Sequence, residues 1–119
     1  MDSRSRTYRN SRFQFLSQPR GVYEAVAYGV LARALMRRDG TAARDAAEAA
    51  LASAAELIER TGAKTLAPAL CEWRAELAGV LGDDATRVQL LREAHRLYEQ
   101  IGAPLQAERI GRLLSEPTS

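Results

Sequence analysis

Apolar residues recur at intervals of three and four along almost the whole chain after residue 20. This spacing predicts amphipathic helices over about 21–38, 41–61, 65–81, 84–101 and 104–114. No alternation of apolar and polar residues, as expected of a half-buried strand, follows residue 20. We therefore predict an all-α domain over residues 20–116, with a flexible basic arm over residues 1–19 and a frayed tail over residues 117–119.

Residues that favour helix ends lie between the predicted segments. Thr41 is expected to cap the second helix, and Asp83 or Asp84 the fourth. Pro68 and Pro104 fit only in the first turn of a helix, so they predict the starts of the third and fifth helices. Most glycines are expected to mark helix ends, and no glycine-rich phosphate-binding motif is present.

The predicted helices repeat after forty residues. Residues 41–63, TAARDAAEAALASAAELIERTGA, align with residues 85–103, ATRVQLLREAHRLYEQIGA, when shifted by forty positions. The aligned pairs are Leu51 and Leu91, Ala54 and Ala94, Leu57 and Leu97, and Gly62-Ala63 and Gly102-Ala103. A period of this length is typical of stacked helical repeats, so we predict antiparallel helix pairs in about two and a half repeats, with five helices in all.

The length and composition exclude several classes of protein. A chain of 119 residues forms one domain, and a single cysteine, Cys71, forms no internal disulfide. The most apolar segment, residues 21–36, is shorter than the roughly 20 residues of a membrane-spanning helix and contains Glu24 and Arg33. With no apolar leader after Met1, the sequence predicts a cytoplasmic protein without a membrane partner.

Positive charge is concentrated in the arm. Residues 1–20 hold five arginines and one aspartate, a net charge of +4, whereas the remaining residues hold twelve basic and fourteen acidic side chains, a net charge of −2. Tyr8 and Phe13 lie among these arginines, so the arm can contact phosphates and stack on bases. One hypothesis is therefore a nucleic-acid-associated regulator, with contacts from Arg4, Arg6, Arg9 and Arg12.

The C-terminal half resembles a known kind of repeat. The run LREAHRLYEQIGAPLQAERIGRLL and the earlier turn ERTGA resemble the C-terminal tetratricopeptide-like (TPR-like) repeats of large actinobacterial regulators. Those regulators include LuxR-type and MalT-like transcription factors and the ATPase-repeat regions attached to class III adenylyl cyclases. The resemblance covers residues 27–115, and it implies a protein-interaction scaffold in a bacterial system of transcriptional regulation.

Candidate catalytic and metal-ligating residues are few. His95 and Cys71 lie on or beside apolar helical stripes, which favours packing roles, and a structural zinc site needs four ligands. We therefore expect no catalytic set, no metal and no cofactor. A small-ligand sensor with a pocket between helices is a further hypothesis.

The leading hypothesis is a non-enzymatic module that binds a protein or a peptide. The first helices of such repeats line the concave face, so the candidate contacts are the polar residues on the first and third predicted helices: Arg33, Arg37, Glu72, Arg74 and Glu76. The first helix is apolar almost all round and needs cover on two sides, either from the arm or from a second copy. We favour the second copy and predict a homodimer.

Overall fold

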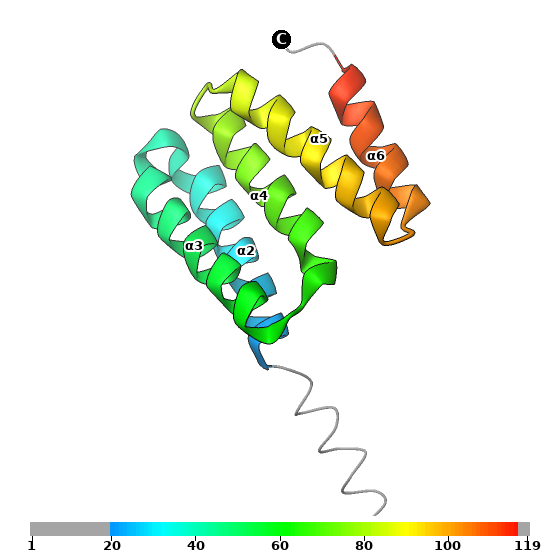
Figure 1. Cartoon of the computed structure of the whole chain (residues 1–119). Helices are drawn as coiled ribbons and strands as arrows, with labels where there is room; N and C mark the ends of the chain where they lie inside the picture. The colour runs from blue at the N-terminus through cyan, green and yellow to red at the C-terminus, as the bar shows by residue number, and fades with distance from the viewer. Residues whose placement is uncertain (1–19, 117–119) are drawn as a thin grey trace, which may run out of the picture.

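The computed structural model describes residues 20–116 of the chain, and most of these residues are helical. The helices are α2 (Arg20–Asp39), α3 (Arg44–Thr61), α4 (Ala67–Val80), α5 (Asp84–Gln100) and α6 (Pro104–Ser115) (Figure 1). No strand occurs among the described residues, so the predicted all-α class is confirmed there. The arm over residues 1–19 and the tail over residues 117–119 lie outside the described residues.

The turns after α3, α4 and α5 have the same geometry. Each contains a glycine with a positive φ, between 68° and 79°, a conformation that side chains with a Cβ disfavour. The residue after each glycine donates its N–H to a carbonyl five residues back, as in the Schellman motif. These bonds run from Ala63 to Ile58, from Asp83 to Ala78 and from Ala103 to Tyr98, at 3.2, 2.8 and 2.9 Å.

The starts of the helices agree only in part with the sequence prediction. Asp83 caps α5, because its carboxylate accepts a hydrogen bond from the Thr86 N–H at 3.2 Å. The predicted cap at Thr41 is wrong: this residue lies inside a 3₁₀ turn, Gly40–Ala43, and α3 begins only at Arg44 without a side-chain cap. Backbone bonds within the turn take the place of the side-chain cap.

The helices pack mainly on their neighbours in the chain. α2 lies along α3, α4 lies along α5, and α5 lies along α6, while α4 also contacts both α2 and α3 (Figure 1). Helix α4 therefore joins an N-terminal group of helices to a C-terminal one. Within residues 20–116, no helix is both long and apolar enough to cross a membrane.

The buried side chains divide in the same way. The N-terminal core, between α2, α3 and α4, contains Ala25, Ala32, Met36, Ala47, Ala50, Leu51, Ala54, Leu57, Ile58 and Leu77. The C-terminal core, between α4, α5 and α6, contains Ala75, Leu91, Ala94, Tyr98, Ala107 and Ile110. Two of the pairs forty positions apart are buried alike, since Leu51 and Leu91 are 2% and 4% exposed and Ala54 and Ala94 are fully buried, whereas Leu57 is buried and Leu97 only partly so.

Gly29 has a role other than ending a helix. It lies in the middle of α2, and a Cβ atom placed on it would come within 2.6 Å of the Trp73 ring. The indole of Trp73 packs on α2 at Gly29. It also packs against the two groups of buried side chains that make up the N-terminal core, one around Leu51 and one around Leu57. The close approach of α2 and α4 therefore depends on the missing side chain at position 29.

Candidate functional site

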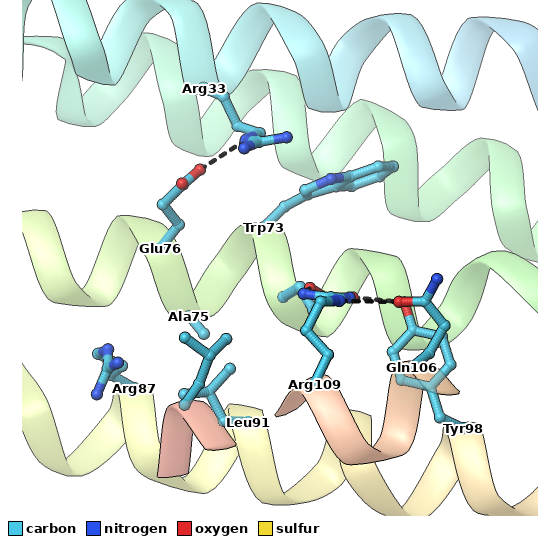
Figure 2. Close-up of a pocket in the computed structure, with 11 residues that line it drawn as sticks. Arg33, Trp73, Ala75, Glu76, Arg87, Leu91, Tyr98, Gln106 and Arg109 are labelled. Atoms are coloured by element: carbon cyan, nitrogen blue, oxygen red, sulfur yellow. Dashed lines mark hydrogen bonds and ion pairs between the residues drawn. The ribbon is translucent and has the colours of Figure 1, made fainter. Parts of the chain in front are cut away.

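A groove of about 620 Å³ lies between α2, α4, α5 and α6 (Figure 2). Trp73, Ala75, Leu91 and Leu113 supply its apolar lining. Its polar and charged lining consists of Arg33, Glu72, Glu76, Arg87, Tyr98, Gln106 and Arg109. Residues of α2, α4, α5 and α6 thus meet at one surface.

Two carboxylates on α4 connect it to the helices on either side. Glu72 and Glu76 are four residues apart, so they lie on the same face of the helix. Glu76 accepts a hydrogen bond from the Arg33 Nε of α2 at 2.9 Å (Figure 2). Glu72 accepts a hydrogen bond from Arg109 Nη2 of α6 at 2.9 Å, and Arg109 Nη1 forms an ion pair with its other carboxylate oxygen at 2.8 Å. Each side of α4 therefore carries an ion pair that reaches the neighbouring helix.

Glu72 is the more enclosed of the two carboxylates. Its side chain is 19% exposed, compared with 40% for Glu76. The Tyr98 hydroxyl of α5 also donates a hydrogen bond to Glu72. Burial and the Glu72 carboxylate together raise the pKa of Tyr98 above its ordinary value, and the hydrogen bond to Glu72 raises the pKa of Arg109. The three side chains thus form one network that joins α4, α5 and α6.

The raised pKa of Tyr98 predicts a loss of stability at alkaline pH. Above the ordinary tyrosine pKa of about 10, the unfolded chain gives up the Tyr98 proton while the folded chain keeps it. The unfolded state then binds fewer protons, so the free energy of unfolding falls as the pH rises. We expect Tyr98→Phe to remove this part of the decline, as measured by urea denaturation at a series of pH values. Parallel curves for the two proteins would contradict the prediction.

The groove lining carries more positive than negative charge. Its described lining carries three guanidinium groups, from Arg33, Arg87 and Arg109, and two carboxylates. Arg33 and Arg109 remain 42% and 46% exposed despite their ion pairs. Arg87 lies 3.8 Å from Asp84, beyond hydrogen-bonding distance. The groove therefore offers N–H donors beside the indole of Trp73.

Three of the five candidate contacts predicted from the sequence lie in the groove: Arg33, Glu72 and Glu76. Arg37 is exposed near the C-terminal end of α2, where it lines a separate shallow surface with Arg33. Arg74 lies on the other side of α4, in a pocket of about 380 Å³ between α3, α4 and α5. The single face expected for all five residues is therefore wrong for Arg74. Positions 72 and 74 are about 200° apart around a helix, which the sequence already implied.

Arg87, Tyr98 and Arg109 line the groove but were not predicted as site residues from the sequence. Tyr98 is 8% exposed and belongs to the C-terminal core, so its hydroxyl reaches Glu72 from a position assigned to packing. Arg109 could have been predicted as a site residue. In the predicted repeat, α6 is the first helix of a third pair, so it is expected to face the same surface as α2 and α4. Gln106, one turn earlier, accepts a further bond from Arg109 at 2.9 Å.

Cys71 and His95 lie apart from the groove lining. Cys71 is half-buried against the C-terminal core, and this burial raises the pKa of its thiol. Such a shift favours the unreactive protonated form. His95 Nδ1 lies 3.3 Å from the Glu99 carboxylate on the same helix. Over residues 20–116, no three His, Cys, Asp or Glu side chains are grouped as a metal site requires.

Comparisons of the chain with known proteins identify no relative. The resemblance to tetratricopeptide-like repeats therefore stays a prediction made from the residues. The chain gives no significant match to protein-family models, to curated proteins or to solved structures.

Proposed function

We propose that the chain is a TPR-like helical-repeat module that binds a segment of another protein in the groove. The observation that carries this proposal is the surface of the groove, to which α2, α4 and α6 contribute most of the lining residues and α5 the rest, and on which three guanidinium groups and an indole lie beside two carboxylates. A surface built from successive first helices is the usual binding surface of stacked helix pairs. The resemblance to repeats of bacterial regulators supports a partner within a regulatory system.

The groove lining favours a partner segment that carries carboxylates. Arg33 and Arg109 are about half exposed, and each has N–H groups beyond those used by Glu76 and Glu72. Guanidinium groups bind carboxylates through paired N–H···O bonds, which gives both affinity and orientation. Trp73 and Leu113 supply apolar contact beside these donors. An acidic segment with at least one large apolar side chain fits this combination.

Selection from a random peptide library displayed on phage tests the proposal. We expect enriched peptides to be acidic and to bind the full chain in a fluorescence polarisation assay. Arg109→Gln removes a charged donor, and losing a hydrogen bond of this kind costs about 1.5–3 kcal/mol, or roughly tenfold or more in Kd. Binding should also weaken as the salt concentration rises.

Arg112→Gln is the matched control. Arg112 lies on the same helix and pairs with Glu108 at 3.0 Å, but it does not line the groove. Arg74→Gln is a second control, because Arg74 faces the other side of α4. Both controls should keep the affinity of the unsubstituted chain. Equal binding by Arg109→Gln, or a failure to enrich any peptide, would rule out the groove as a binding surface of this kind.

A further inference from the structure

The outer face of α2 carries an apolar stripe that no other helix within residues 20–116 covers. Tyr23, Val26, Val30 and Leu31 are 54%, 39%, 58% and 46% exposed, although α2 supplies the N-terminal core with its opposite face. The positions on this face follow a spacing of four and three residues: Tyr23, Ala27, Val30, Ala34 and Arg37. This is the spacing of a seam between two packed helices, and the alanines let a second helix come close.

The charges beside the stripe favour a second copy of the same helix. Glu24 and Arg38 are fourteen residues apart, so they lie about 40° apart around α2, on one flank of the stripe. When two antiparallel helices are related by a twofold axis between them, the same flank of both helices lies on the same side of the pair. Arg38 pairs with Asp39 of its own chain at 2.9 Å and stays 73% exposed, and Glu24 then lies opposite the partner's Arg38, with the reciprocal pair at the other end.

A parallel arrangement has the opposite electrostatic result. It places residues of the same number at the same height, so Arg37 and Arg38 of the two copies crowd together. Like charges at such a contact are unfavourable, whereas the antiparallel arrangement separates them by most of the length of the helix. It also places Tyr23 against the partner's Arg37, where a guanidinium can stack on the phenol ring.

We propose that α2 forms the interface of a homodimer, in which the two helices pack antiparallel about a twofold axis near Val30. Val30 contacts its own counterpart, Val26 contacts the partner's Ala34, and Leu31 meets the partner's Leu31 on the flank. The interface is isologous and closes on itself, so assembly stops at two chains. This proposal goes beyond the peptide-binding function and does not depend on it.

Sedimentation velocity of the full chain tests the assembly. We expect a dimer at micromolar concentration and dissociation on dilution. Val30→Glu brings two carboxylates together at the twofold axis and should give a monomer with an unchanged helical circular dichroism spectrum, whose melting temperature no longer depends on protein concentration. Leu105→Glu is the control, because Leu105 is 80% exposed on α6, outside the stripe. A monomer for the unsubstituted chain at high micromolar concentration, or a dimer for Val30→Glu, would overturn the proposal.

Disulfide trapping in a Cys71→Ser background tests the direction of the two helices. A mixture of Tyr23→Cys and Arg37→Cys chains should form the mixed disulfide-linked dimer under mild oxidation, because these positions face each other in the antiparallel arrangement. Tyr23→Cys alone should stay unlinked. Rapid self-linking of Tyr23→Cys would show parallel helices and overturn the antiparallel interface.

Discussion

Replacing Leu51 by alanine is expected to lower the free energy of unfolding by about 2–5 kcal/mol. Leu51 lies in the middle of α3, is 2% exposed and is among the largest fully enclosed side chains of the described residues. Alanine at this position loses the transfer free energy of the buried carbons and leaves a cavity between α2, α3 and α4. For a domain with a total stability of about 5–15 kcal/mol, this is a large share.

Leu105→Ala makes the same chemical change on the surface and is the matched control. Leu105 is 80% exposed near the start of α6, so its substitution should change the stability by no more than about 0.5 kcal/mol. Urea denaturation followed by circular dichroism measures both variants. Similar losses for the two substitutions would contradict the position of Leu51 in the N-terminal core.

The second large effect is expected at Gly29. Replacing a glycine in a helix interior by alanine normally raises the free energy of unfolding by up to about 1 kcal/mol. At position 29 the new Cβ would lie 2.6 Å from the rigid ring of Trp73, and overpacking of this kind costs about 1–3 kcal/mol. We therefore expect Gly29→Ala to lower the free energy of unfolding despite the better helix propensity of alanine.

Gly111→Ala on α6 is the control for Gly29→Ala. A Cβ at position 111 would meet only His95, at 3.9 Å, which is an ordinary contact, so this variant should gain stability. Trp73 is the only tryptophan of the chain, so its fluorescence reports the steric clash between the new Cβ at position 29 and the indole directly. In Gly29→Ala the indole should move outward, and its emission should shift to longer wavelength. An unchanged spectrum with increased stability would show that α2 and α4 are not in close contact at this point.

The helices and their ends could be predicted from the sequence, because they depend on residues that are close together in the chain. Helical spacing of apolar side chains sets the extents of α2 to α6, and Asp83 caps α5 because an aspartate oxygen reaches an N–H three residues further on. Gly62 and Gly102 end α3 and α5 because glycine tolerates a positive φ. These interactions span a few residues, so they can be recognised without knowledge of the fold.

The groove could be predicted only in part. The alternation of helices indicates that α2, α4 and α6 share a face, and Arg33, Glu72 and Glu76 were selected on that basis. Their ion pairs could not be predicted, because Arg33 and Glu76 are 43 residues apart and Glu72 and Arg109 are 37 residues apart. The contact of Gly29 with Trp73 is likewise set by how closely two distant helices approach, which spacing alone does not determine.

The division of the core at α4 has a consequence for the lifetimes of bound states. α6 is held by the C-terminal core and by the ion pair of Arg109 with Glu72, and it makes no comparable contact with α2 or α3. Terminal helices with few partners open at a lower free energy than interior ones, so we expect α6 to detach while α2, α3 and α4 stay folded. Each such event removes one wall of the groove. The frequency of this local opening would therefore set an upper limit on how long the proposed partner segment is retained between α4 and α6.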